Sequence, residues 1–255
     1  MRKFSLLVVA ALLTGLIMTA APTAVPAQVA VGISVRIGPP PLRVLAVQPI
    51  APGPGYLWTP GYWAWSPAGY YWVPGAWELA PAPGLLWTPG YWGYGGDAYV
   101  WHAGYWGPHV GFYGGINYGF GYFGNGFAGG HWARGRFYYN TAVWRVNRTV
   151  IHTTYVDRTV IRNVQDRRVS YNGGPGGMRA RANASEMRYA RERRMQATPG
   201  QTRRESRARM STRQNGRGRN RQPQAERRDQ RRAKPNNKGK DKREKKDDQR
   251  GPGRI

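Results

Sequence analysis

Few side chains in the middle of this chain could take part in acid–base chemistry. Glu78 and Asp97 are the only carboxylates between Arg43 and Arg134, and such a pair could serve as the acid and base of a glycoside hydrolase. Asp97, however, stands in the sequence GGDA, where turn chemistry fully explains an aspartate. No nucleophile stands out beside a general base, so the sequence predicts a protein without catalytic residues.

The histidines make only a weak case for a metal site. His102 and His109 lie close in sequence, but they lack the carboxylate or thiolate companions that transition-metal sites usually have. The chain contains no cysteine, which excludes disulfides, thiolate ligands and cysteine nucleophiles. We therefore expect no metal and no cofactor.

Tryptophan and glycine form the most conspicuous pattern. The phrase LWTPGYW occurs twice, and two looser copies bring the number of W-x-x-G-x-W motifs between residues 53 and 108 to four. The motif residues are Trp58, Gly61, Trp63, Trp72, Gly75, Trp77, Trp87, Gly90, Trp92, Trp101, Gly104 and Trp106. The first tryptophans of successive motifs lie 14, 15 and 14 residues apart. This period is too short for two helices and suits two short strands with two turns.

The centre of each motif is turn chemistry, Pro-Gly in three copies and Ala-Gly in the fourth. If each centre closes a hairpin, Trp58 faces Trp63, and the same holds for the other three motifs. The longer loops then pair Trp63 with Trp72, Trp77 with Trp87 and Trp92 with Trp101. The sequence thus predicts a mainly β fold, an antiparallel meander of about eight short strands with the tryptophans in one row. The alternative is that Pro-Gly forms corners between bent strands, because two-residue hairpins prefer type I′ and II′ turns.

A row of tryptophans must be covered, either by the chain itself or by another molecule. Large exposed apolar patches are uncommon, so we favour a structural core over a ligand platform. The alternative is a glycan-binding face, since residues 44–133 carry almost no charge and sugars stack on flat aromatic rings.

The N-terminus has the pattern of an export signal. Arg2 and Lys3 precede a short apolar stretch at residues 6–18, and small residues suitable for cleavage follow around Ala21 and Ala27. The stretch is shorter than the roughly 20 residues of a membrane span. We expect residues 1–27 to be a signal peptide, with an uncleaved anchor as the alternative, and no transmembrane span in the mature chain.

The segments on either side of the motifs are also expected to be extended. In residues 28–52 the apolar positions from Val29 to Ile37 alternate, which predicts a half-buried strand followed by a proline-rich linker. Residues 109–165 mix glycine with aromatics and are expected to continue the β structure or to cover the tryptophans. The echo NRTVI and DRTVI at 147–151 and 157–161 is interpreted as two extended segments.

The C-terminal part is strongly basic. Residues 178–255 hold 27 basic and 9 acidic side chains, a net +18 (27 − 9), within a chain of net charge +26. This stretch has no Trp, Phe, Leu or Val and cannot bury enough apolar surface to offset chain entropy. We therefore expect residues 166–255 to be a disordered basic tail. Its candidate polyanion-binding residues are Arg203, Arg204, Arg213, Arg217, Arg219, Arg221, Arg227, Arg228, Arg231 and Arg232.

The motifs, followed by GFYGGINYGFGYFG at 111–124 and FYYNTAVWRVN at 137–147, resemble the YXWGXW repeat family of exported bacterial proteins. The resemblance implies export and a repeat architecture, and it carries no activity. The fourth motif departs from the pattern because HAG replaces TPG.

These features favour an exported protein of the periplasm, the outer surface or the extracellular space. Its basic tail would associate with anionic polymers such as lipopolysaccharide, extracellular DNA or acidic glycan. The alternatives are a neutral-glycan module that uses the aromatic face, and sequence-independent nucleic-acid binding through the tail. No small-molecule substrate is expected, and the oligomeric state stays open.

Overall fold

The computed structural model describes residues 33–43, 47–161 and 168–232, with the side chains of the last helix described as far as Asn215. The predicted signal peptide lies outside the described residues. Among the helices that are described, none has the length and apolar character needed to cross a membrane. Most of the regular structure is β-strand, as the sequence predicts.

The motif region forms eight short antiparallel strands. They are β2 (Tyr56–Thr59), β3 (Tyr62–Ser66), β4 (Gly69–Val73), β5 (Ala76–Leu79), β6 (Leu86–Thr88), β7 (Tyr91–Gly95), β8 (Ala98–His102) and β9 (Tyr105–Gly107). The number of strands and their antiparallel sense are as predicted.

The strand order differs from a simple meander. β3 pairs with β4 and β7 with β8, so Trp63 faces Trp72 and Trp92 faces Trp101 as predicted. The hairpins predicted at Pro-Gly are wrong, and so is the predicted pairing of Trp77 with Trp87, because β2 pairs with β5 and β6 with β9. Trp58 therefore faces Trp77, and Trp87 faces Trp106. Strands β2–β5 form one long bent hairpin, here the first bent hairpin, and β6–β9 form the second.

Each Pro-Gly is a corner at which the bent hairpin turns while its register continues. Thr59 pairs with Ala76 before the corner, and Tyr62 pairs with Val73 after it. The glycines of the four motif centres lack the positive φ of a type II turn, which the loop glycines such as Gly69 and Gly84 do have. This is why the hairpin prediction failed: glycine stands at the corner for a reason other than its φ.

The reason is the close approach of the opposite arm, which places both a tryptophan ring and backbone atoms against the glycine; a Cβ on Gly90, for example, would lie 2.7 Å from Gly104 N and 2.8 Å from His102 O. A Cβ on Gly61 would lie 2.5 Å from Cζ2 of Trp72, and a Cβ on Gly75 would lie 2.7 Å from Cζ2 of Trp58. The second bent hairpin repeats this arrangement at 2.5 Å, with Trp101 over Gly90 and Trp87 over Gly104. The first tryptophan of every motif thus covers the glycine of the partner motif, and only glycine leaves room for it.

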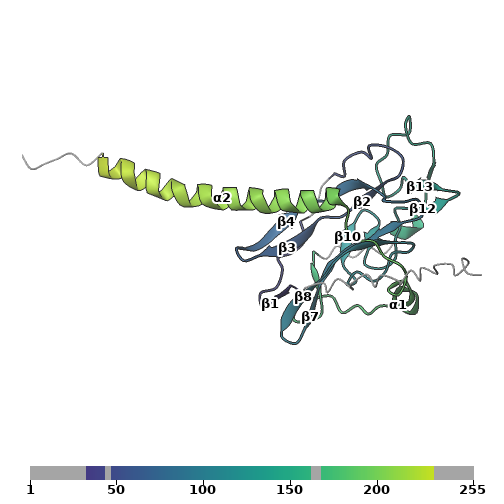
Figure 1. Cartoon of the computed structure of the whole chain (residues 1–255), viewed down its shortest axis with the longest axis horizontal. Helices are drawn as coiled ribbons and strands as arrows, with labels where there is room; N and C mark the ends of the chain where they lie inside the picture. Colours follow the sequence, from purple (N-terminus) through teal and green to yellow (C-terminus); the bar gives the residue numbers. More distant parts are fainter. Residues whose placement is uncertain (1–32, 44–46, 162–167, 233–255) are drawn as a thin grey trace, which may run out of the picture. The chain divides into compact units, whose positions relative to one another are not determined.

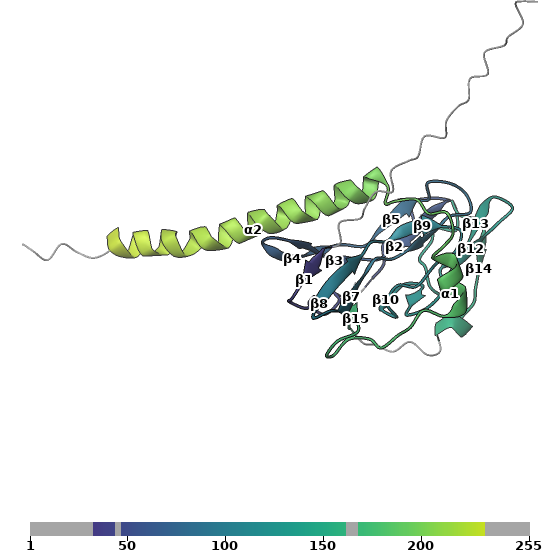
Figure 2. The same ribbon diagram turned by 60° about the horizontal axis from the view of Figure 1, so that its bottom comes forward.

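The corners direct the two halves of each bent hairpin into different cores. The halves in which β2 pairs with β5 and β6 pairs with β9 contribute Trp58, Trp87 and Trp106 to the larger core. The halves made of β3–β4 and β7–β8 contribute rings to a smaller core around Trp92 and Tyr99. Figures 1 and 2 show β12 and β13 beside β2, with β3–β4 and β7–β8 on the opposite side.

The glycine- and aromatic-rich segment covers the larger core. It contains β10 (Asn117–Gly119), β11 (Tyr122–Phe123), β12 (Gly130–Ala133), β13 (Arg136–Asn140) and β14 (Thr154–Tyr155). Tyr113, Tyr122, Tyr139 and Trp144 from this segment are almost fully buried against the motif tryptophans. The motif tryptophans of the larger core are thus covered largely by the chain that follows them.

The NRTVI and DRTVI echo forms two turns, so the predicted extended segments are wrong there. Asn147 Oδ1 accepts hydrogen bonds from the backbone and hydroxyl of Thr149 at 3.0 and 2.6 Å. Asp157 Oδ1 accepts the same pair from Thr159 at 2.9 and 2.6 Å, at the start of the 3-10 turn η1 (Thr159–Ile161). Asn and Asp side chains commonly compete with strand pairing in this way.

The predicted N-terminal strand is shorter than expected. Only β1 (Ser34–Val35) is formed within the described residues, paired with β8. Val35 is buried, but Ile33 and Ile37 of the same expected face are exposed, and positions 29–32 lie outside the described residues. The sheet is completed by β15 (Tyr171–Asn172), which runs parallel to β7 in the order β1-β8-β7-β15.

Part of the basic tail that was predicted to be disordered is helical in the structure. Within residues 166–255 it describes α1 (Ala184–Tyr189) and α2 (Pro199–Arg232), while residues 233–255 lie outside the described residues. The first turns of α2 contact β4 (Figure 1). Apolar burial is indeed scarce here, and the contacts that hold α2 are mostly polar.

Candidate functional site

The candidate site is the place where α2 joins the first bent hairpin. Arg204 donates from one guanidinium nitrogen to Glu78 on β5 and from another to Thr59 Oγ1 at 3.0 Å. The next residue, Glu205, accepts hydrogen bonds from Tyr62 at 2.8 Å and from Tyr71 at 3.1 Å. Two adjacent side chains of opposite charge thus fix the basic helix to two arms of one hairpin.

The start of α2 is stabilised by a capping box. Thr198 Oγ1 accepts from Gln201 N at 3.2 Å, Gln201 Oε1 accepts from Thr198 N at 2.7 Å, and Pro199 opens the helix. Gln201 Oε1 also accepts from Trp106 Nε1 at 2.9 Å, which ties the helix start to the second bent hairpin. The sequence TPGQ at 198–201 is the signal that could have revealed this helix.

Burial and the Glu205 carboxylate keep the docking phenols neutral. For Tyr71 burial first, then the charge and hydrogen bond of Glu205, raise the pKa to about 12. The pKa of Tyr62 is raised further for the same reasons in the same order. Both hydroxyls therefore remain hydrogen-bond donors to Glu205 at neutral pH.

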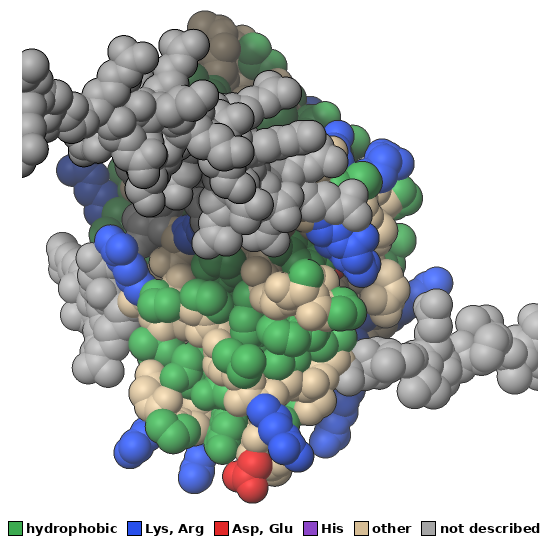
Figure 3. Space-filling model, turned by 90° about the vertical axis from the view of Figure 1, so that its left-hand side faces the viewer, with side chains coloured by type: hydrophobic (Ala, Val, Ile, Leu, Met, Phe, Trp, Pro, Cys, Tyr) green, Lys and Arg blue, Asp and Glu red, His purple; other side chains and the backbone are tan. Residues whose placement is uncertain are grey.

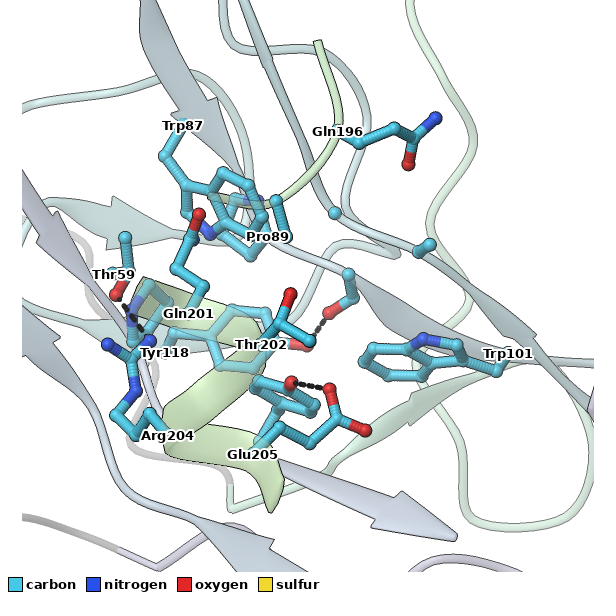
Figure 4. Close-up of a pocket in the computed structure, with 16 residues that line it drawn as sticks. Thr59, Trp87, Pro89, Trp101, Tyr118, Gln196, Gln201, Thr202, Arg204 and Glu205 are labelled. Carbon is cyan, nitrogen blue, oxygen red and sulfur yellow. Dashed lines mark hydrogen bonds between the residues drawn. The ribbon is translucent and has the colours of Figure 1, made fainter. Parts of the chain in front are cut away.

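A small pocket lies beneath the helix start, between the corners of the two bent hairpins. In Figure 4 the guanidinium of Arg204 points toward Thr59 and away from Trp101, and Gln201 lies toward Trp87 and Pro89. Several of the polar atoms of these α2 side chains are already hydrogen-bonded. Its volume of about 110 Å³ is well below the roughly 300–1,000 Å³ of small-molecule sites. We interpret this pocket as a small gap in the packing between α2 and the bent hairpins, and not as a substrate site.

In the described C-terminal part of the chain, the glutamates are bonded to other residues, whereas most arginines of α2 are exposed. Glu186 belongs to the capping box of α1, Glu192 accepts from His109 at 3.0 Å, and Glu205 accepts from the two tyrosines. Of the described α2 arginines, only Arg204 is partly buried. The exposed ones are Arg203, Arg207, Arg209 and Arg213. Because these three glutamates are engaged internally, the positive charge of the four exposed arginines, in the part of α2 whose side chains are described, faces solvent.

The predicted polyanion-binding residues therefore divide into groups. Arg203 and Arg213 are exposed, whereas Arg204 is engaged by Glu78 and is removed from the candidate set. Sequence reasoning omitted Arg207 and Arg209, although the basic run that contains them is visible in the sequence. The remaining candidates lie on α2, where side chains are not described, and are Arg217, Arg219, Arg221, Arg227, Arg228, Arg231 and Arg232.

The motif tryptophans lie mostly in the interior. Trp58, Trp63, Trp87, Trp92 and Trp106 are buried. The half-buried ones are Trp72, Trp77 and Trp101. Figure 3, which looks onto the end with the β3–β4 and β7–β8 tips, shows hydrophobic side chains gathered among Lys and Arg side chains.

The titratable residues weighed for catalysis or metal binding are not brought together. Glu78, on the first bent hairpin, pairs with Arg204 of α2, while Asp97 lies at positive φ in the β7–β8 loop. His102 stacks on Tyr91 at 4.5 Å, and burial lowers its pKa. His109 instead contacts Glu192, so the two histidines have separate partners.

The family comparison matches the same units that the geometry defines. A model of the WXXGXW repeat matches two copies, at residues 53–78 and 83–106. The chain carries the WXXGXW repeat. Each matched copy contains two W-x-x-G-x-W motifs and coincides with one bent hairpin. No curated protein and no solved structure matches the chain.

Proposed function

We propose that this WXXGXW repeat protein is a non-catalytic component of the bacterial cell envelope that binds anionic polymers. In this account it is exported to the periplasm, the outer surface or the extracellular space. The repeat sheets hold an arginine-rich helix that associates with lipopolysaccharide, extracellular DNA or acidic glycan. The observation that carries the proposal is the exposed positive charge of the described part of α2. The carboxylates of Glu205 and Glu78 do not neutralise it, because both are bonded where α2 contacts the first bent hairpin.

The physical basis is the release of counterions from a polyanion. A flexible basic chain must be ordered when it binds, whereas α2 is already helical and capped at Thr198. Its arginines can contact phosphate or carboxylate groups through planar, two-pronged hydrogen bonds. Recognition of this kind reads charge density and is insensitive to sequence.

Export and the lack of catalysis rest on separate observations. The first 27 residues have the charge and apolar pattern of a signal peptide. Glu78, the better placed of the two candidate catalytic carboxylates, is occupied by Arg204 in an ion pair with little solvent exposure. A carboxylate held in this way is a poor general acid or base.

The binding proposal is tested by the salt dependence of binding to double-stranded DNA. Replacing Arg203, Arg207, Arg209 and Arg213 by Gln should weaken binding and flatten the plot of log K against log salt by about 0.9 for each phosphate that is no longer neutralised. The matched control replaces the same residues by Lys, which keeps the charge and should keep most of the slope. An unchanged slope in the Gln variant would contradict the role of α2.

Export is tested by fractionation of a producing bacterium and N-terminal sequencing of the protein. We expect a mature chain that begins after Ala21 or Ala27 and is found outside the cytoplasm. A cytoplasmic chain that retains residues 1–27 would exclude the envelope assignment.

A further inference from the structure

A groove much larger than the pocket at the dock runs between β4 and α2. Its volume of about 700 Å³ falls within the roughly 300–1,000 Å³ of small-molecule and cofactor sites. Its walls combine aromatic rings, arginines and small polar groups, of which the ones used below are Arg43, Trp63, Trp72, Arg207, Ser211 and Asn215.

The aromatic wall is rigid and partly open. Trp72 is half-buried, and one end of its ring is held over Gly61. Trp63 meets it edge-on, with ring centroids 5.3 Å apart and planes at 68°. The ring face carries negative electrostatic potential, so it attracts the polarised C–H groups of a sugar ring laid against it. A ring fixed before binding loses little entropy when a ligand arrives.

Two arginines line the groove with uncompensated charge. The Arg43 guanidinium lies 4.9 Å from the centroid of the Trp63 ring, and Arg207 is exposed on α2. In the described part of the chain neither makes an ion pair, in contrast to Arg204, which also lines the groove. Guanidinium groups in this state are available to a ligand carboxylate.

The polar wall is made of groups that can bind hydroxyls. Ser211 and Asn215 are exposed on the stretch of α2 that faces the groove. A hydroxyl and a carboxamide can each donate to and accept from a sugar hydroxyl. The groove thus offers an apolar ring, two cations and neutral hydrogen-bonding groups within one concavity.

We infer that this groove binds an acidic saccharide, with a sugar ring against Trp72, its carboxylate at Arg43 and Arg207, and its hydroxyls at Ser211 and Asn215. The inference rests on the proposed function and names the polymer class that it prefers. A single-stranded nucleic acid fits less well, because it stacks successive bases on successive exposed rings. Here Tyr71 is buried and donates to Glu205, and the ring of Tyr70 already packs edge-on with Trp65 and Trp92, at centroid distances of 4.8 and 5.3 Å.

The experiment is calorimetric titration of the full-length protein with three probes. They are an oligogalacturonate, a neutral galactan oligomer of the same length, and a single-stranded DNA oligonucleotide of the same charge as the galacturonate. The test variant is Arg43→Gln/Arg207→Gln. The matched control is Arg203→Gln/Arg213→Gln, which removes the same charge from exposed positions that do not line the groove. Circular dichroism establishes that each variant is folded.

We expect the wild-type chain to bind the oligogalacturonate more tightly than the DNA, and the neutral galactan least. The groove variant should lose about tenfold or more in affinity for the oligogalacturonate, because charge-assisted hydrogen bonds are removed. The control should lose much less. A Trp72→Leu substitution in the otherwise unchanged chain should also weaken oligogalacturonate binding while sparing DNA.

Three outcomes would overturn the inference. One is an equal loss in the groove variant and the control, which would leave the general polyanion role of α2 intact. Another is a selective loss of DNA binding in the groove variant, which would identify the groove as a nucleic-acid site. The third is failure of the wild-type chain to bind any of the charged probes, in which case the proposed function falls as well.

Discussion

The two bent hairpins have the same backbone plan but different corner residues. The first has Pro60-Gly61 opposite Pro74-Gly75, and the second has Pro89-Gly90 opposite Ala103-Gly104. Gly104 is nevertheless covered by Trp87 as closely as Gly90 is covered by Trp101. The corner therefore depends on the glycine and the opposing tryptophan, and proline is an accessory.

The surroundings of the two hairpins differ more than their interiors. The first carries α2 through Thr59, Tyr62, Tyr71 and Glu78. The second is extended by β1 and β15 and meets α2 mainly through Gln201 at Trp106. A duplicated scaffold has thus been given two different roles, one to hold the basic helix and one to complete the sheet.

The largest expected effect comes from removing an equivalent tryptophan from either hairpin. Trp58→Ala and Trp87→Ala should each destabilise the fold by about 3–5 kcal/mol, because both rings are buried and leave a cavity. Denaturant unfolding followed by circular dichroism measures the loss. A near-neutral result for one hairpin alone would show that the two are not equivalent.

The second largest loss of stability should follow the addition of a methyl group at a corner. Gly61→Ala and Gly90→Ala should each cost about 1–3 kcal/mol through overpacking, since the new Cβ meets a tryptophan ring at 2.5 Å and backbone atoms of the opposite arm within 3 Å. Gly95→Ala is the matched control, because a Cβ there would meet nothing within 4 Å and its φ is not positive. If Gly95→Ala were as costly as Gly90→Ala, the contact with the ring would not be the cause.

The contact between α2 and the first bent hairpin should make one contribution to stability that is lost at alkaline pH. The pKa of Tyr71 is raised from 10.0 to about 12, so its contribution to stability is complete below about pH 10 and is lost as the pH rises through 12. We expect a stability loss in this window that is smaller in Tyr71→Phe, at a cost of roughly 1 kcal/mol at neutral pH for the missing hydrogen bond. Unfolding measured at a series of pH values checks this, with Tyr138→Phe as the control. An unaltered pH profile in Tyr71→Phe would contradict the role of Tyr71 in holding α2 on the first bent hairpin.

The smallest effect should follow removal of a corner proline. Pro89→Ala makes the second hairpin match its own partner corner at Ala103, so we expect a loss of only about 0.4–1 kcal/mol from the greater freedom of the unfolded chain. Thermal unfolding is sensitive enough to detect it. A loss of stability as large as that of Gly90→Ala would show that the corner depends on the proline.

Two of the strand pairings in the motif region were predictable from loop lengths. The spacing of Trp63 to Trp72 and of Trp92 to Trp101 fixed two pairings correctly, because the loops between them are short. The corners were given only as the alternative to hairpins, because a sequence does not show whether a glycine is needed for positive φ or for the absence of a Cβ. Gly75 and Gly104 are of the second kind.

The candidate site was less accessible to sequence reasoning. Hydrophobic periodicity cannot reveal α2, because its dock uses Arg204, Glu205 and Gln201 rather than an apolar stripe. The partners of these residues lie on strands far earlier in the chain, such as Tyr62. Only the capping signal at residues 198–201 was local enough to be read directly.

The central claim is that the motif works across the hairpin, with the first tryptophan covering the glycine of the partner motif. A double-mutant cycle between Gly90→Ala and Trp101→Leu tests it most directly, with Gly90→Ala and Trp87→Leu as the reference cycle. We predict a coupling energy of about 1–2 kcal/mol for the first cycle and a much smaller one for the second. Additivity in the first cycle, or equal coupling in both, would contradict the cross-hairpin contact.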